Sequence, residues 1–273
     1  MVRSSLALLA VVLSWRAASA DDTIRIITYN IHHGEGTDGR LDLDRIARVI
    51  REARADIVCL QEVDRGLPRT DKLDFPALLA DCLGMRAVFE PNLQFDGGDY
   101  GNMTLTNLEI VSVENLRLPG PEGREPRGCL RTVLRVSERE IDVLNTHLGL
   151  ESAERQEQAA VILERLSDRP TVLAGDLNEA ITDPALGMLT RVLRDTAAPG
   201  VATFPAATPK KRIDFILASD AFEAVSADVL SSPDTAVASD HRPFVAELRW
   251  SVPERSSGHG GGSDIGEAAI EKK

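Results

Sequence analysis

The stretch Thr171-Val-Leu-Ala-Gly-Asp-Leu-Asn178 is an apolar segment that stops at a glycine and is followed by two polar side chains. Its first four residues are typical of a buried strand. Asp176 and Asn178 then lie at the carboxyl end of that strand, where open α/β sheets collect ligand-binding groups. Asp and Asn also favour turns, so the pair alone is compatible with an ordinary turn.

Polar residues end or border other apolar runs in the same way. These are Asn30, Glu62, His147 and the pair Asp240-His241. Alone, each has an ordinary explanation as a solvated carboxylate, a hydrogen-bonded structural histidine or an exposed loop. Asp214 is different, because it lies inside the apolar run of residues 213–217. A buried carboxylate is costly unless it is paired, so we expect a partner such as a histidine.

The overall composition describes an acidic globular protein. Hydrophobic residues make up 43% of the 273 residues, enough for a sizeable core, and the formal net charge is -12. A strongly acidic protein does not attract nucleic acid through its bulk field, which weakens the case for a DNA substrate. Bound cations or a local basic patch can still reverse the field at a single cleft.

The first residues have the pattern of a secretory signal peptide. Met1-Val-Arg3 is a positive start, residues 6–13 form an apolar run, and Ala18-Ser-Ala20 is a small-x-small cleavage signal. The run is far shorter than the roughly 20 residues that a membrane span needs. We therefore expect cleavage near Ala20 and a secreted or periplasmic protein without a transmembrane segment. At the other end, the Ser- and Gly-rich residues 251–273 predict a disordered tail.

Between these ends, hydrophobic periodicity predicts a mixed α/β order. Helices are expected at residues 42–54, 75–83, 152–166 and 184–192, the second closed by Gly84 and the third capped by Ser152. Strands are expected at residues 24–29, 55–60, 85–89, 103–106, 110–118, 130–136, 141–146, 171–174, 213–217, 224–229 and 244–250. The five strands between residues 85 and 146 follow one another without helices, which predicts hairpins or a meander. This order favours one α/β domain with packed mixed sheets and helices outside.

The cysteine count allows at most one internal disulfide. Cys59 lies in an apolar run and is expected to be a buried small hydrophobe. Cys82 and Cys129 could form a bridge, and the sequence leaves that open.

Taken together, the motifs resemble those of the endonuclease/exonuclease/phosphatase superfamily, the DNase I-like metal-dependent phosphoesterases. The matching segments, in the family's order, are Thr28-Tyr-Asn-Ile-His-His-Gly34, Leu60-Gln-Glu-Val-Asp64, Tyr100-Gly-Asn102, Asn145-Thr-His147, Gly175-Asp-Leu-Asn178, Arg212-Ile-Asp-Phe215 and Ser239-Asp-His-Arg-Pro243. The resemblance implies a four-layer sandwich of two packed mixed β-sheets flanked by helices, over residues 21–250. It is specific for fold and reaction class and weakly specific for substrate.

The resemblance also implies a metal site. Glu62 resembles the main carboxylate ligand of a divalent cation, with Asn30 beside it and Asp240 completing or supporting the site. Mg²⁺, with Mn²⁺ as an alternative, suits such oxygen ligands.

Five further residues resemble the family's catalytic groups. Asp176 and Asn178 match the pair that positions and helps to deprotonate the attacking water. His241, held by Asp214, matches the second histidine of the family, and His147 would donate to a non-bridging phosphate oxygen. The resemblance leaves open which group is the general base and which the general acid.

Some segments depart from the family pattern. After Tyr100-Gly-Asn102 many relatives continue into a strand that ends in Ser-Arg, and this chain has Met103-Thr-Leu-Thr-Asn107 instead. Residues 96–100, 123–127 and 203–205 could form substrate contacts or ordinary surface loops.

The expected function is metal-assisted, in-line attack of water on a phosphodiester or phosphomonoester, by a protein that acts as a monomer. A small or lipid-derived phosphate ester is favoured, because the chain has no long basic insertion for duplex binding. The alternatives are an extracellular nuclease, a sphingomyelinase or a phosphodiesterase related to glycosylphosphatidylinositol remodelling. A degenerate phospho-ligand-binding module and a purely structural secreted domain are the non-enzymatic alternatives.

Overall fold

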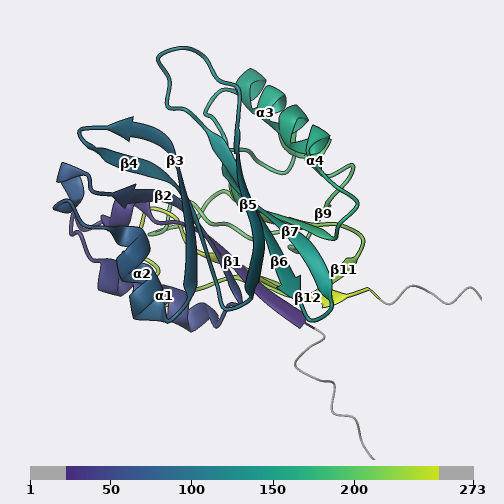
Figure 1. Cartoon of the computed structure of the whole chain (residues 1–273), viewed down its shortest axis with the longest axis horizontal. Coiled ribbons are helices and arrows are strands. Elements are labelled where there is room, and N and C mark those ends of the chain that lie inside the picture. Colours follow the sequence, from purple (N-terminus) through teal and green to yellow (C-terminus); the bar gives the residue numbers. More distant parts are fainter. Residues whose placement is uncertain (1–22, 252–273) are drawn as a thin grey trace, which may run out of the picture.

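The computed structural model describes residues 23–251, which form two six-stranded sheets packed face to face (Figure 1). The expected signal peptide lies outside these residues, as does the expected tail apart from Ser251. Within the described residues, no helix has the length and apolar character that a membrane crossing needs.

Each sheet has a parallel pair of strands at its centre and antiparallel pairs on both sides. The first sheet has the order β11-β12-β1-β2-β4-β3, from β1 (Thr23–Asn30), β2 (Ile57–Arg65), β3 (Arg86–Phe95), β4 (Gly98–Thr106), β11 (Phe222–Val229) and β12 (Phe244–Trp250). The second has the order β5-β6-β7-β8-β10-β9, from β5 (Glu109–Arg117), β6 (Gly128–Val136), β7 (Arg139–His147), β8 (Thr171–Asp176), β9 (Arg194–Asp195) and β10 (Asp214–Ala218). The predicted run of strands without helices is confirmed as the β3–β4 hairpin and the β5–β6–β7 meander.

The helices cover the outer faces of the two sheets. They are α1 (Leu43–Ala53), α2 (Phe75–Leu83), α3 (Ser152–Glu164) and α4 (Pro184–Leu189), with 3₁₀ turns η2 (His32–Gly34) and η3 (Pro68–Thr70). Figure 1 shows α1 and α2 on one side of the molecule and α3 and α4 on the other.

Helix α2 begins and ends as predicted, and the other three helices are shorter than predicted. The Asp42 side chain caps α1 by accepting from the Arg45 amide at 2.8 Å, and Gly84 closes α2 in a left-handed conformation. The prediction that Ser152 caps α3 is wrong, because Ser152 is the first helical residue and the cap position is Glu151. Helices α3 and α4 also end before the predicted residues 166 and 192, at Glu164 and Leu189.

Three apolar cores separate four layers. The first core joins the helices α1 and α2 to the outer face of the first sheet, and the third joins α3 and α4 to the outer face of the second sheet. The middle core lies between the sheets and contains Ile24, Ile26, Ile141, Val143 and Val172. This arrangement confirms the expected DNase I-like sandwich.

The middle core gives way to buried polar groups toward the carboxyl ends of the central strands. Asn145 accepts from Gln61 Nε2 at 2.8 Å and donates to the carbonyl oxygens of Leu60 and Met103 at 3.1 and 2.8 Å. Because Asn145 belongs to the second sheet and its three partners to the first, these bonds fix one sheet against the other directly below the polar site.

The cysteines play no covalent part in this fold. All three are free: Cys59 and Cys129 are buried and Cys82 is exposed. The burial predicted for Cys59 is confirmed, and the possible bridge between Cys82 and Cys129 is not formed.

Candidate functional site

The alternation of side chains along each strand carries the site residues to the space between the sheets. Successive residues of a strand face opposite sides, so Asn30 shares the inner face of β1 with Ile24 and Ile26. His147 and Asp176 continue the inner rows of β7 and β8 in the same way. The two parallel pairs pack against each other, and their carboxyl ends therefore meet at a single edge.

Asp214 reaches the same point from an antiparallel strand. It begins β10 and lies opposite Asp176 in the β8–β10 register. The next inner-face residue, Ile216, belongs to the middle core. Asp214 is therefore a fully buried carboxylate at the boundary between core and site.

Glu62 is presented by a bulge in β2. The register between β2 and β4 shifts between Leu60 and Val63, and Glu62 itself has a φ of 59°. A bulge inserts an extra residue and redirects a side chain, and a left-handed conformation at a non-glycine residue costs free energy. Both features turn the Glu62 carboxylate toward the edge where β1 and β8 end.

Hydrogen bonds join these groups into one cluster. Asn30 Nδ2 donates to Glu62 Oε1 at 2.8 Å and to Asp176 Oδ2 at 3.1 Å. The same Asp176 oxygen lies 3.5 Å from the Nε2 atoms of both His147 and His241. Asp176 Oδ2 is therefore the point on which both sheets and both histidines converge.

His241 is held by two carboxylates. Its Nδ1 lies 2.9 and 3.2 Å from the two oxygens of Asp214, and its Nε2 faces Asp176. Burial disfavours the imidazolium, but the charges of Asp214 and Asp176 outweigh it and raise the pKa of His241 to about 10. The partner expected for the buried Asp214 is thus a histidine, and that histidine is charged at neutral pH.

At Asp176, in contrast to His241, burial outweighs the neighbouring groups that favour the charged form. Burial raises its pKa to about 7, although the charge of His241 and the hydrogen bonds from Asn178 and Asn30 favour the carboxylate. The charge of Asp214 adds to the increase. The neighbouring positive charge and hydrogen bonds therefore do not fully compensate the cost of burying this carboxylate.

His147 is the neutral member of the pair of histidines. Burial and the charge of Arg127 lower its pKa well below the usual value, with a smaller contribution from His241. Arg127 Nη1 lies 2.9 Å from His147 Nδ1, so that nitrogen accepts and the ring proton lies on Nε2. Asn178 Nδ2 donates to the Leu148 carbonyl at 3.0 Å, and its 3.1 Å approach to His147 Nε2 is a contact between two donors in this tautomer, not a hydrogen bond.

Asp240 and the Asn30 amide are less directly placed as cation ligands. Asp240 Oδ1 accepts from Ser239 Oγ at 3.4 Å, and Ser239 Oγ also donates to the Asn30 carbonyl at 2.8 Å. Asn30 Oδ1 accepts from the His32 amide at 3.0 Å, so its nitrogen, and not its oxygen, faces the carboxylates. The structure thus brings all eight predicted residues to one edge, with Asn30 bridging two carboxylates and Asp240 linked through Ser239.

The oxygen-rich side of this cluster fits a divalent cation. Glu62 and Asp176 aim carboxylate oxygens at the same amide nitrogen, and burial leaves Asp176 short of positive charge. Asp176, Asp214 and His241 also offer three ligand atoms within 4.8 Å of one another. Both Asp214 oxygens are occupied by His241, however, and Mg²⁺ prefers oxygen to imidazole nitrogen. The donor chemistry therefore favours a position beside Glu62.

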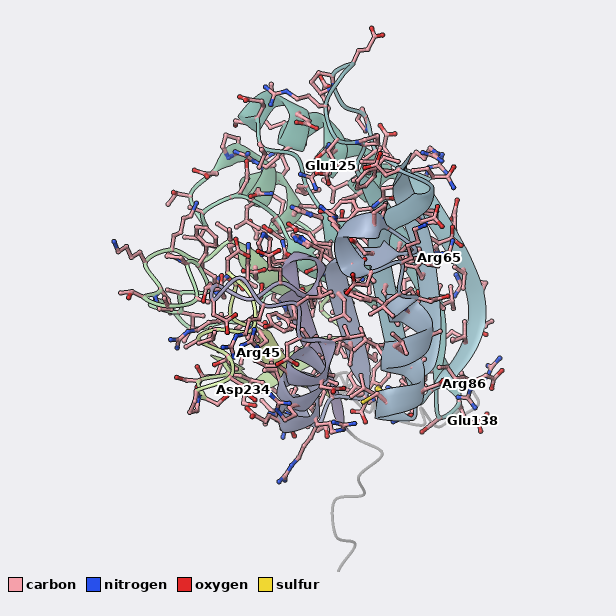
Figure 2. The ribbon with its side chains drawn as sticks, turned by 90° about the vertical axis from the view of Figure 1, so that its left-hand side faces the viewer. Arg45, Arg65, Arg86, Glu125, Glu138 and Asp234 are labelled. Atoms are coloured by element: carbon pink, nitrogen blue, oxygen red, sulfur yellow. The ribbon has the colours of Figure 1, made fainter. Side chains whose placement is uncertain are left out.

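Two site contacts come from loops that the sequence marked only as possible substrate contacts. Arg127 is almost fully buried and donates both to His147 and, at 2.6 Å, to Glu125 Oε1. The ring of Phe204 lies 4.9 Å from the ring of His241. Figure 2 places Glu125 at one end of the molecule and Arg86 and Glu138 at the other, which identifies the end that carries the site.

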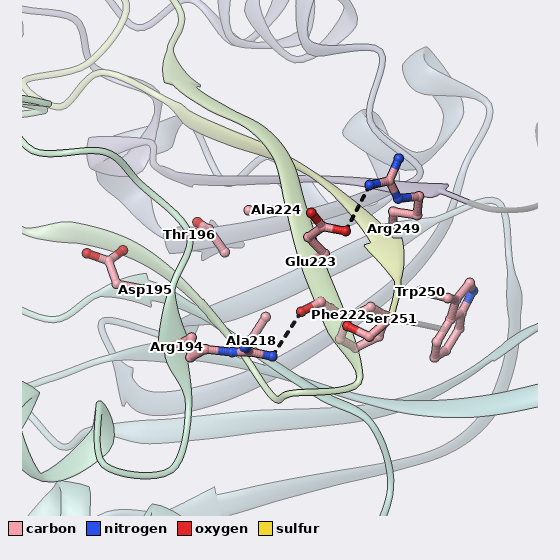
Figure 3. Close-up of a pocket in the computed structure, with 10 residues that line it drawn as sticks. All are labelled: Arg194, Asp195, Thr196, Ala218, Phe222, Glu223, Ala224, Arg249, Trp250 and Ser251. Atoms are coloured by element: carbon pink, nitrogen blue, oxygen red, sulfur yellow. Dashed lines mark hydrogen bonds and ion pairs between the residues drawn. The ribbon is translucent and has the colours of Figure 1, made fainter. Parts of the chain in front are cut away.

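A separate cavity of about 650 Å³ lies at the edges of the sheets near Ser251 (Figure 3). Two of its polar groups are engaged in the wall, since Arg249 pairs with Glu223 at 2.8 Å and Arg194 donates to the Phe222 carbonyl at 3.4 Å. None of the eight predicted site residues lines this cavity. It is therefore distinct from the candidate active site.

Comparison with known proteins agrees with the fold and site described above. The sequence profile of the Endonuclease/Exonuclease/phosphatase family matches residues 27–241. The chain is 31% identical over 248 residues to Uncharacterized protein YbhP of Escherichia coli K12, covering 83% of this chain and 96% of YbhP. An endonuclease/exonuclease/phosphatase structure from Beutenbergia cavernae DSM 12333 is 27% identical with a TM-score of 0.70, over 84% of this chain and 72% of that one.

A second solved structure shares the fold at lower identity. The mannosyl-6-phosphatase of Bacteroides thetaiotaomicron VPI-5482 is 21% identical with a TM-score of 0.69, over 83% of this chain and 100% of that one. The profile match covers every predicted site residue from Asn30 to His241. This chain therefore belongs to the endonuclease/exonuclease/phosphatase family.

Proposed function

We propose that the protein hydrolyses phosphate esters with the help of a divalent cation held beside Glu62. Members of its family are phosphoesterase hydrolases and generally depend on divalent metals. The observation that carries the proposal is the convergence on Asp176 Oδ2, which lies within 3.5 Å of Asn30 and of both histidines. A structural role alone would not need carboxylates buried so close together.

Residues of this chain can supply the groups that in-line hydrolysis of a phosphate ester requires. Asp176 is an acceptor for a proton of the attacking water, and Asn178 lies beside it to orient that water. His241, kept charged by Asp214, stabilises negative charge on the phosphate, and neutral His147 offers its Nε2–H as a donor. When bound, the cation would neutralise charge on the phosphate oxygens. Glu62 would supply a carboxylate oxygen to it, and we propose Mg²⁺ or Mn²⁺ as the ion.

The test is turnover of a panel of esters by residues 21–250. Bis-p-nitrophenyl phosphate, plasmid DNA, sphingomyelin and inositol phosphates are each incubated with Mg²⁺ or Mn²⁺, with and without EDTA. Hydrolysis that needs the ion supports the proposal, and the preferred ester separates the nuclease, sphingomyelinase and phosphatase alternatives. Hydrolysis that survives EDTA contradicts the role of the cation.

Two substitutions test the assigned roles. His241→Ala and Asp176→Ala are each expected to lower kcat by at least about a hundredfold, in the range of general acid–base groups. Glu138→Gln is the matched control, because this exposed side chain lies at the opposite end of the molecule (Figure 2). Near-normal rates in both site variants would contradict the roles. Tight ligand binding with no turnover of any ester would favour the degenerate binding module.

We also propose that the protein acts outside the cytoplasm and as a monomer. The first part rests on the charge and apolar pattern of residues 1–20. It predicts that the exported protein begins near Asp21, which N-terminal sequencing of the periplasmic or secreted fraction checks. Light scattering checks the second part.

A further inference from the structure

A groove beside the candidate site has an apolar lining and a cationic rim. It encloses about 470 Å³, and its lining includes Ile181, Pro199, Val201 and the adjacent lysines Lys210 and Lys211. Ile181 is 54% exposed, so its side chain is accessible to a ligand in the groove. Ile181 follows the site residue Asn178 by three residues along the chain.

A stacked series of side chains connects the lysines to the site. Lys211 Nζ lies 5.0 Å from the centre of the Phe204 ring, within the range of a cation–π contact. The same ring also contacts His241, at 4.9 Å between ring centres. Phe204 therefore contacts both a lysine of the groove and the histidine to which we assign phosphate stabilisation.

The lysine pair also differs from the neighbouring arginine in its partners. Across residues 23–251, no carboxylate oxygen lies within 4.0 Å of either Lys210 or Lys211. Arg212, the next residue, forms an ion pair with Asp195 and covers the Phe215 ring at 4.0 Å, so its charge is already engaged. In a chain with a net charge of -12, two adjacent unpaired cations create a local positive potential beside the site.

We propose that this groove binds the part of the phosphoester substrate that lies beyond the scissile phosphate, and that this part carries an apolar group and a second negative charge. The link to a substrate rests on the proposed function. Ligand pockets typically combine an apolar lining with a few polar groups that fix orientation, and this groove has that composition. A long polyanion such as duplex DNA fits less well, because the chain as a whole carries a net charge of -12.

The first experiment measures binding without metal or turnover. In EDTA, 8-anilinonaphthalene-1-sulfonate is titrated into the protein, with uncharged N-phenyl-1-naphthylamine as its counterpart. The Lys210→Gln/Lys211→Gln double variant is expected to bind the sulfonate about five- to tenfold more weakly and the uncharged dye within twofold, since each exposed charge contributes modestly. Lys72→Gln is the matched control, because Lys72 is the remaining lysine of residues 23–251 and is exposed. Unchanged sulfonate binding in the double variant would overturn the proposal.

The second experiment joins the groove to catalysis. Two p-nitrophenyl phosphodiesters are compared, one with phenyl and one with 4-carboxyphenyl as the second ester group. The double lysine variant is expected to raise KM for the carboxyphenyl ester at least fivefold and to change turnover of the phenyl ester less than twofold, and Lys→Arg at both positions should restore the wild-type KM. Equal effects on both esters would overturn the role of the groove and leave the proposed hydrolysis intact. If the wild-type protein cleaves neither these two esters nor any ester of the panel above with Mg²⁺ or Mn²⁺, the proposed function fails, and the dye titration alone then decides whether the groove binds anions.

Discussion

Replacing Arg127 with Met removes the donor that fixes one of the two site histidines. Arg127 Nη1 donates to His147 Nδ1 at 2.9 Å and to Glu125 Oε1 at 2.6 Å. Without it, His147 loses the contact that keeps its ring proton on Nε2. Loss of one preorganised donor or its support at such a site typically lowers kcat by about 10² to 10³, and we expect kcat with bis-p-nitrophenyl phosphate to fall by at least about a hundredfold.

The same change has a smaller effect on stability. A hydrogen bond to a charged group contributes about 1.5–3 kcal/mol, but the Glu125 side chain is 36% exposed and water replaces part of that contribution. We therefore expect the free energy of unfolding, measured in urea, to fall by about 1–2 kcal/mol. Adding Glu125→Gln should recover part of the stability and none of the activity, because it removes the unpaired charge and does not restore the donor.

Arg124→Met is the control for this prediction. Arg124 lies in the same loop, but its ion pair with Glu151 is longer, at 3.6 Å, and both side chains are more than half exposed. Its loss should change stability by less than about 0.5 kcal/mol and leave kcat unchanged. If Arg127→Met hydrolyses the ester within threefold of wild type, or if Arg124→Met loses as much activity, the reasoning about His147 is refuted.

Three further outcomes follow from the contacts described. Glu62→Gln should weaken Mn²⁺ binding at least tenfold by calorimetry while the protein stays folded, and unchanged affinity would exclude Glu62 as a ligand. Gly175→Ala should lower the free energy of unfolding by about 2 kcal/mol or more, and the urea midpoint with it, since a Cβ there would lie 1.9 Å from the Thr146 carbonyl oxygen of the neighbouring strand; a wild-type midpoint would contradict this. In the native protein at pH 8, a thiol reagent should modify Cys82 alone, because burial raises the pKa of the two other thiols to about 12, and all three should react in urea.

The sequence predicted the parts of the site that follow regular strands. Asn30, His147 and Asp176 each come directly at the end of a run that the sequence identifies as a strand, and the structure shows that they share the inner face with Ile26, Val143 and Ala174. The need of Asp214 for a partner was also evident, because a carboxylate in an apolar run must be compensated. The histidine that provides this compensation is His241.

Features that depend on irregular backbone or on distant loops were not predictable in the same way. The strand expected to end at Leu60 continues to Arg65, because a bulge absorbs Glu62 and restores the alternation after it. Arg127 lies in a segment rich in Pro, Gly and charge, which is typical of a solvated loop. Its burial against His147 depends on how that loop folds back onto β7, and no local pattern encodes this contact.

The strict alternation along the central strands also limits how this chain can change its length. Deleting or inserting a single residue between Ile24 and Asn30, or between Val172 and Asp176, would rotate the polar end group onto the face covered by helices. Connections such as residues 118–127 and 197–212 carry no such parity requirement. Related chains that diverge in specificity should therefore differ in the lengths of these connections and keep the number of residues in the central strands constant.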